Sequence, residues 1–103
     1  MNRIERIAKM EQNLDVSAEA IRELSAALDK YEAALPAWKK LCDYYGSAQW
    51  MRDYEADEAG KLPKDLKRGV LSEDAVYDLI AENRELMISL LDVARIALSG
   101  GLL

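Results

Sequence analysis

The chain has 103 residues, of which 50% are apolar and 32% charged, and its formal net charge is -5. This length suffices for one domain and is too short for two, so we expect a single domain over residues 1–103. The acidic balance repels a phosphate backbone at long range, which argues against general nucleic-acid binding.

The first predicted element is a long helix from Ile4 to Leu35. Apolar residues recur along it at intervals of seven, at Ile7, Leu14, Ile21, Leu28 and Leu35. This spacing places their side chains on one face of a helix. Glycine and proline are absent from residues 1–35. Pro36 lacks an amide donor and its ring clashes with the preceding turn, so we expect the helix to stop or kink near Leu35.

Two short helices are predicted in the middle of the chain. The first covers about 36–45, because proline suits a first helical turn, and Gly46 ends it. The second has Ser47 as its N-cap and ends near Ala59, before Gly60.

Residues 61–71 are predicted to be a connection, because they contain Pro63 and Gly69. The last helix begins at Ser72, whose hydroxyl can accept hydrogen bonds from free backbone donors, and runs to about Leu98. Its broad apolar face consists of Val76, Leu79, Ile80, Met87, Leu90, Leu91, Ala94 and Leu98.

The predicted fold class is all-α, an antiparallel helical bundle of two long helices with two short helices between them. At about 1.5 Å per residue, the first helix is roughly 50 Å long and the last roughly 40 Å. They cannot cover each other completely. The excess apolar stripe of the first helix must meet the middle helices or a second molecule, which gives the hypothesis of a homodimer.

One continuous run, residues 66–79, is the most specific sequence pattern in the chain. It is preceded by Tyr44, Tyr45, Ser47, Trp50, Asp53, Asp57, Glu58 and Gly60. The pattern resembles the DUF4298-like family of short bacterial all-helical proteins, a domain of unknown function, over nearly the whole chain. The resemblance implies a bacterial cytosolic helical protein, and it brings no activity, cofactor or catalytic residue with it.

The cellular location is inferred from the cysteine content and the apolar runs. Cys42 is the single cysteine, cannot form an internal disulfide, and is interpreted as a small buried apolar residue. Residues 1–10 mix charged with apolar side chains, unlike a signal peptide. No run approaches the roughly 18 apolar residues of a membrane span. We therefore expect a cytoplasmic protein without membrane contact.

An acidic group in the second short helix consists of Asp53, Glu55, Asp57 and Glu58. Such carboxylates could hold Mg²⁺ or Mn²⁺, which prefer oxygen ligands. Glu55-x-x-Glu58 with Glu82-x-x-Glu85 is similar to the all-helical nucleotide pyrophosphohydrolases of the MazG type, which place four acids around Mg²⁺. The second pair departs from their usual Glu-x-x-Asp. A solvated acidic face is the favoured interpretation, so no metal and no other cofactor is expected.

Aromatic residues gather in the middle of the chain, at Trp38, Tyr44, Tyr45, Trp50 and Tyr54. They could form an interaction surface, because Tyr and Trp combine an apolar body with a polar tip. The chain has no Phe, so they could also fill the core. Core packing is favoured, and a mixture is plausible in which Trp38 and Trp50 point inward while the hydroxyl of Tyr45 or Tyr54 binds the nearby acids.

The connection is locally basic, because Lys61, Lys64, Lys67 and Arg68 stand against Asp65. It could bind a phosphate or, if residues 63–85 formed a helix-turn-helix, DNA. The recognition helix would then carry four acids with the wrong sign for phosphates, Glu73, Asp74, Asp78 and Glu82. We favour pairing of the basic connection with the acidic helix before it.

The chain has no histidine to act as a base, and Cys42 has no evident base nearby, so catalysis by a nucleophile is disfavoured. We predict a non-catalytic helical interaction protein that binds an unknown protein partner. The alternatives are a Mg²⁺- or Mn²⁺-dependent pyrophosphohydrolase-like enzyme and a small DNA-binding regulator. The candidate interaction surface consists of Tyr44, Tyr45, Trp50, Asp53, Tyr54, Asp57, Glu58, Lys67 and Arg68.

Overall fold

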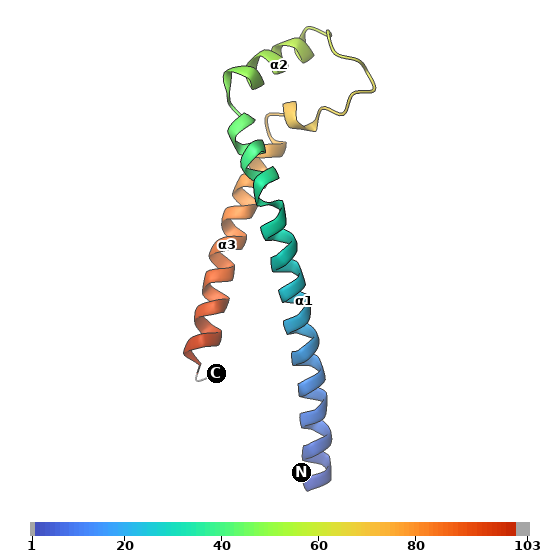
Figure 1. Ribbon diagram of the computed structural model, residues 1–103, viewed down its shortest axis with the longest axis vertical. Coiled ribbons are helices and arrows are strands. Elements are labelled where there is room, and N and C mark those ends of the chain that lie inside the picture. Colours follow the sequence, from blue (N-terminus) through green and yellow to red (C-terminus); the bar gives the residue numbers. More distant parts are fainter. Residues whose placement is uncertain (1, 101–103) are drawn as a thin grey trace. The chain divides into compact units, whose positions relative to one another are not determined.

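The computed structural model describes residues 2–100, and their regular structure is entirely helical, as predicted. In chain order the elements are the α-helix α1 (Arg3–Tyr44), the α-helix α2 (Ala48–Glu58), the 3-10 helix η1 (Gly69–Leu71) and the α-helix α3 (Ala75–Ser99) (Figure 1). Residues 2–100 contain no strand. None of the helices in this described part combines the length and apolar character that crossing a bilayer requires.

The chain divides into two compact units, which are described separately. Unit 1 is residues 1–40 and holds most of α1. Unit 2 is residues 41–103 and holds the last residues of α1 together with α2, η1 and α3. A single domain and an antiparallel bundle stay predictions.

The predicted end of the first helix at Leu35 is wrong, because α1 continues through Pro36 to Tyr44. The separate short helix expected over 36–45 is therefore the last part of α1, and α2 is the one short α-helix of the described chain. Proline has a φ angle that suits a helix, so its cost is the lost hydrogen bond and the crowding of the previous turn. Strong helix formers such as Ala and Leu flank it on both sides and offset that cost.

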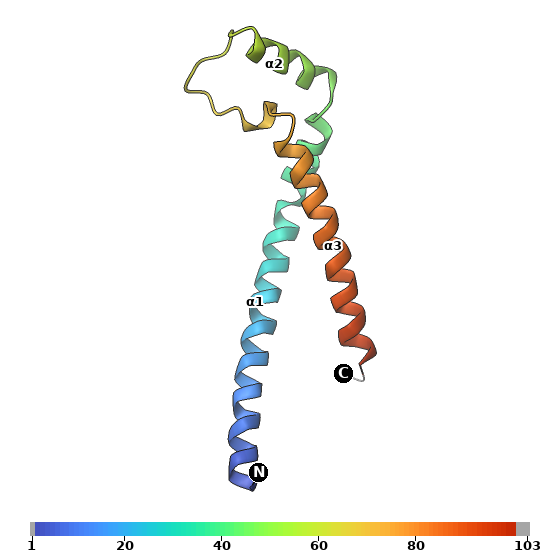
Figure 2. The same cartoon turned by 180° about the vertical axis from the view of Figure 1, so that it is seen from behind.

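Both ends of α2 were predicted correctly. The backbone N–H of Trp50 donates to Ser47 Oγ at 3.1 Å, which makes Ser47 the N-cap. Gly46 and Gly60 flank the helix with φ angles of 78° and 69°, in the left-handed region that favours glycine. The loop from Gly60 onward then runs away from α2 and back toward α3 (Figure 2).

The predicted connection contains one tight turn and η1. The turn is closed by the N–H of Leu66, which donates to the carbonyl of Pro63 at 3.2 Å. The last helix begins at Ala75, three residues later than predicted. Ser72 still provides its start signal, because Ser72 Oγ accepts from the N–H groups of Asp74 and Ala75, both at 3.3 Å. The Ser72 side chain thus closes a turn that precedes α3, and it does not cap the first turn of the helix itself.

The buried apolar residues of the described chain are few and all lie in unit 2. They are Trp50 from α2, Leu71 from η1 and Val76 from α3. The apolar stripe predicted for the first helix is present, yet α1 has no buried residue. The small core therefore joins α2, η1 and the start of α3, and it includes no side chain of unit 1.

Candidate functional site

The aromatic residues around Trp50 form the centre of the candidate site. The ring of Tyr45 meets the ring of Trp50 edge to face at a centroid distance of 5.4 Å. Tyr54 stacks on Trp50 at 5.3 Å with a 20° angle between the rings. Trp50 is only 7% exposed, and its Nε1 donates to the carbonyl of Val70 at 2.9 Å. The favoured interpretation as core packing thus holds for Trp50.

Glu73 ties two tyrosines of this cluster to the start of the last helix. The Tyr45 hydroxyl donates to the Glu73 carbonyl oxygen at 2.9 Å, and the Tyr54 hydroxyl donates to Glu73 Oε1 at 2.8 Å. The hydrogen bond to Glu73 and the negative charges of nearby carboxylates raise the pKa of Tyr54. Tyr54 does bind an acid, as expected, but Glu73 itself was not among the predicted site residues.

A second tyrosine–carboxylate contact joins the end of α1 to α2. The Tyr44 hydroxyl donates to Asp53 Oδ2 at 2.6 Å, and Gln49 Nε2 donates to Asp53 Oδ1 at 3.0 Å. The hydrogen bond to Asp53, with burial and the carboxylate charge, raises the pKa of Tyr44 to about 12. The same hydrogen bonds lower the pKa of Asp53. Both oxygens of Asp53 are therefore engaged within unit 2.

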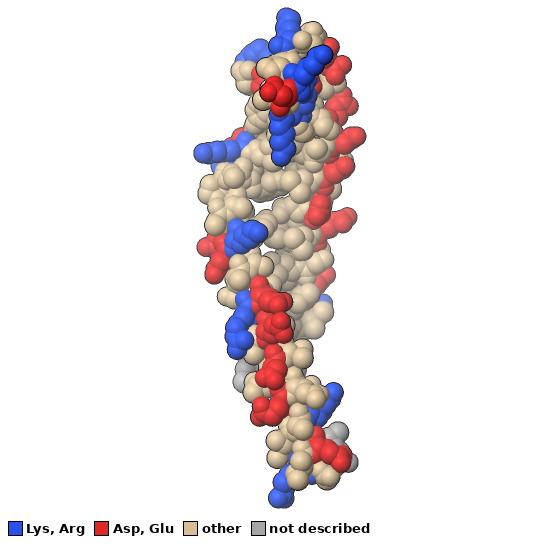
Figure 3. Space-filling model, turned by 90° about the vertical axis from the view of Figure 1, so that its right-hand side faces the viewer, with Lys and Arg blue, Asp and Glu red and all other residues tan. Residues whose placement is uncertain are grey.

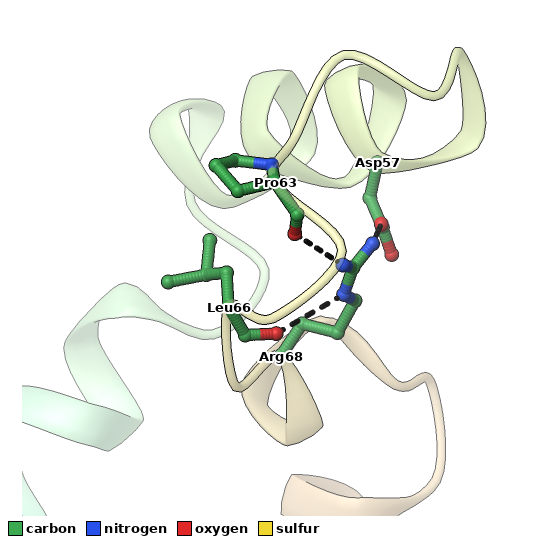
Figure 4. A network of polar contacts seen from close by, with 4 residues as sticks. All are labelled: Asp57, Pro63, Leu66 and Arg68. Atoms are coloured by element: carbon green, nitrogen blue, oxygen red, sulfur yellow. Dashed lines mark hydrogen bonds and ion pairs between the residues drawn. The ribbon is translucent and has the colours of Figure 1, made fainter.

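Arg68 contacts three acceptors, one in α2 and two within the connection (Figure 4). Its Nη1 contacts Asp57 Oδ1 at 2.5 Å, its Nη2 donates to the Pro63 carbonyl at 2.5 Å, and its Nε donates to the Leu66 carbonyl at 3.3 Å. The planar guanidinium supplies donors in several directions, which a lysine ammonium cannot reproduce. The predicted pairing of the basic connection with the acidic helix is thus seen at this one residue.

Two surface hollows lie beside these contacts. One has a volume of about 270 Å³ and is lined by Tyr44, Asp53, Leu62, Leu66, Lys67, Arg68, Val70 and Leu71. The other has a volume of about 390 Å³ and is lined by Lys67, Gly69, Val70, Ala75, Val76 and Leu79. Lys67 and Val70 are common to both. Four of the predicted surface residues border a hollow, while Leu62, Leu66 and Val70 were missed.

The remaining predicted site residues are not brought together in the same way. Glu58 is exposed at the end of α2. Cys42, which was predicted to be a small buried residue and not a site residue, is half-buried. Within residues 2–100, no group of three or more Cys, Asp or Glu side chains is placed so that it could hold a metal ion. Residues 63–85 contain only one α-helix, α3, so they do not form a helix-turn-helix.

Some of the missed residues carried no signal in the sequence. Val70 and Pro63 contribute backbone carbonyls, and any residue type can supply a carbonyl. Glu73 was interpreted only as an acid of the last helix, although its position between η1 and α3 brings it near α2. The four apolar residues Leu62, Leu66, Val70 and Leu71 recur at intervals of four, four and one, which was the available clue to an apolar wall.

Comparison with known protein families gives a match. The family described as "Domain of unknown function (DUF4298)" matches residues 7–93 of the chain. No curated protein and no solved structure matches the chain. The matched segment includes all the residues of the candidate site.

Proposed function

We propose that this chain, which belongs to the DUF4298 family, a domain of unknown function, is a non-catalytic helical interaction protein. Its binding surface is the pair of hollows around Lys67, and its partner is a protein segment that carries apolar side chains beside carboxylates. The observation that supports this most is that Lys67 and Val70 line both hollows.

The apolar part of the surface has a fixed base and an accessible edge. Leu71 and Val76 are buried and line one hollow each. Leu66 and Val70, by contrast, stay 49% and 43% exposed at the same hollows. Exposed apolar side chains that are anchored beside a packed core are typical of places where a partner buries its own apolar residue.

The charged part of the surface is basic. The side chains of Lys61, Lys64 and Lys67 are exposed and form no hydrogen bond or ion pair with residues 2–100. Figure 3 shows Lys and Arg side chains gathered over the part of unit 2 that holds α2 and the connection, with Asp and Glu side chains beside them. On a chain of net charge -5 this local excess of positive charge favours a partner segment that carries carboxylates.

The nearby acids support a non-catalytic role. Asp53 accepts hydrogen bonds from Tyr44 and Gln49, and Asp57 pairs with Arg68. These contacts give both carboxylates a structural task in holding α2 to its neighbours. No observation on residues 2–100 favours the pyrophosphohydrolase-like enzyme or the DNA-binding regulator over an interaction protein.

A titration followed by NMR tests the proposal. The full chain, labelled with ¹⁵N, is titrated with two twelve-residue peptides, one alternating Leu with Asp and Glu, the other alternating Leu with Lys. We expect the acidic peptide to shift the amide signals of residues 66–71 and Val76, and the basic peptide to leave them unchanged. Lys67→Glu should weaken binding of the acidic peptide about tenfold, because it reverses the central charge.

Lys64→Glu is the matched control, because Lys64 is also exposed but lines neither hollow. It should weaken binding less than about threefold, as expected of a charge at the rim. Equal effects of the two variants, or no shift with either peptide, would contradict the proposal. A titration with Mg²⁺ or Mn²⁺ that shifts Asp53, Asp57 and Glu58 instead would favour the enzyme.

A further inference from the structure

A seven-residue repeat runs along unit 1. Taking Ile7 as position a of a heptad, the a positions are Ile7, Leu14, Ile21, Leu28 and Leu35. The d positions are Met10, Ser17, Leu24, Tyr31 and Trp38. All but Ser17 are apolar or aromatic. Five successive heptads of this kind exceed the three to four that indicate a coiled coil.

The start of this stripe is accessible along the first turns of α1. Ile7 is 55% exposed, Leu14 60% and Ile21 69%. Unit 1 is a single helix, so it contains no second segment that could cover the stripe. An isolated helix is stabilised mainly by packing of its apolar face, so this face requires a partner.

Helix lengths limit what the chain itself can offer. α1 has 42 residues and α3, the next longest helix of the described chain, has 25. Even if α3 ran along α1 over its full length, about 25 Å of α1 would extend beyond it at about 1.5 Å per residue. A partner from outside the chain is needed for that excess.

We propose that residues 4–24 of α1 form a parallel, in-register, two-stranded coiled coil with a second copy of the chain. Within a parallel coiled coil, Ile at an a position with Leu at the following d position, as at Ile21 and Leu24, favours two strands. On a straight α-helix, a strict seven-residue apolar stripe turns slowly around the helix axis. When two such helices wind around each other, their stripes stay in contact along their length. The surface is distinct from the hollows of unit 2, so the coiled coil stands or falls independently of the proposed function.

The charges beside the stripe complement themselves in the parallel arrangement. Arg6 occupies position g and Glu11 occupies position e of the following heptad. In a parallel pair the g residue of one chain faces the e residue of the next heptad in the other, so Arg6 meets Glu11 of the second copy twice by symmetry. In an antiparallel pair g faces g and e faces e, and this match is absent.

The mass of the full chain in solution tests the pairing. Sedimentation equilibrium should give twice 11.6 kDa for the unsubstituted chain. Leu14→Glu should raise the dissociation constant about 100-fold or more, because it places two carboxylates in an apolar seam. Val16→Glu is the matched control, since Val16 is 68% exposed but lies at position c, away from the seam. It should change the constant less than about threefold.

Two further experiments test the orientation. Arg6→Glu should weaken the dimer about five- to tenfold, and adding Glu11→Arg should restore it. In a Cys42→Ser background, Met10→Cys should form a disulfide between the two chains on mild oxidation, because the two d residues face each other. Far-UV circular dichroism shows whether each variant keeps its helix.

A monomer up to high micromolar concentration would overturn the proposal. Equal effects of Leu14→Glu and Val16→Glu would also overturn it, because the seam would then not be the contact. If Leu14→Glu loses helix, the charge-reversal pair, which changes only exposed side chains, decides in its place. A dimer in which Met10→Cys does not crosslink and the double charge reversal does not restore affinity would rule out the parallel register.

Discussion

Unit 1 and the contacts around α2 in unit 2 obtain their order in opposite ways. In unit 1 the backbone bonds are those of one helix, and no residue of α1 is buried. Around α2, side chains join positions far apart in the sequence, such as Trp50 with Val70 and Tyr45 with Glu73. Periodicity alone specifies the first region, whereas a few long-range contacts specify the second. We therefore expect the region around α2 to open cooperatively and unit 1 to depend on whatever covers its stripe.

The largest expected effect is the loss of Trp50, the buried residue on which the contacts around α2 converge. Trp50→Ala should destabilise unit 2 by about 3–5 kcal/mol, because it removes a buried ring and leaves the Val70 carbonyl without its donor. Hydrogen exchange of residues 47–76 should then accelerate strongly while residues 5–30 change little. The exposed neighbour Met51→Ala should have an effect below about 1 kcal/mol. Uniform acceleration along the chain would erase the contrast between the two regions.

Pro36 offers the next largest change, and here the substitution should stabilise. Pro36→Ala restores a helical hydrogen bond and removes a clash, so it should stabilise α1 by about 1–3 kcal/mol. Thermal melting followed by circular dichroism measures the gain. Pro63→Ala, in a turn, should show no such gain and a small loss from the freer unfolded chain. A lower melting temperature for Pro36→Ala would show that the helix needs the shape that proline imposes.

Arg68 provides a smaller test of the contacts around α2. Arg68→Ala should destabilise unit 2 by about 1–2 kcal/mol, because three acceptors lose their donor while the pair with Asp57 is partly exposed. Arg68→Lys should recover little, since an ammonium cannot reach all three acceptors. Exchange in residues 61–71 should rise with ionic strength in the unsubstituted chain. Exchange that ignores salt would mean that the hydrogen bonds to carbonyls, and not the ion pair, hold the connection.

The smallest expected effect is a titration at the junction of α1 and α2. Because the folded pKa of Tyr44 is raised from 10.0 to about 12, its contribution to stability is complete below pH 10 and is lost as the pH rises toward 12. The pKa of Asp53 is lowered from 3.8, so its contribution is present above that pH and is lost as the pH falls below it. The ionisation of Tyr44 is followed by ultraviolet absorbance. Asp53→Asn should move the Tyr44 pKa back toward 10, and Gln49→Ala should move it much less.

The sequence predicted correctly those helix ends that depend only on neighbouring residues. The ends of α2 were predicted from Ser47, Gly46 and Gly60, because caps and left-handed turns depend on adjacent residues. Pro36 misled the prediction, because a local breaker was outweighed by the helix formers around it. The start of α3 was misplaced because Ser72 can close a turn or cap a helix with the same hydroxyl.

The candidate site was predictable in kind and less so in detail. A basic connection facing an acidic helix predicted an ion pair, but the sequence did not single out Arg68 and Asp57 among the possible pairs. Glu73 was missed because its contacts with Tyr45 and Tyr54 span 28 and 19 residues, and they form only after the chain reverses. Val70 was missed because its backbone oxygen is the acceptor.

The two glycines that flank α2 have a stereochemical consequence. At Gly46 and Gly60, no atom of a residue beyond the two chain neighbours lies within 4 Å of where a Cβ would stand, so space does not forbid a side chain there. The handedness of the amino acid does, because an L residue in this conformation costs roughly 1–2 kcal/mol. A D-alanine, whose preferred angles are the mirror image, would fit both positions without strain. A chemically synthesised chain with D-alanine at these sites would keep both reversals and lose less entropy on folding.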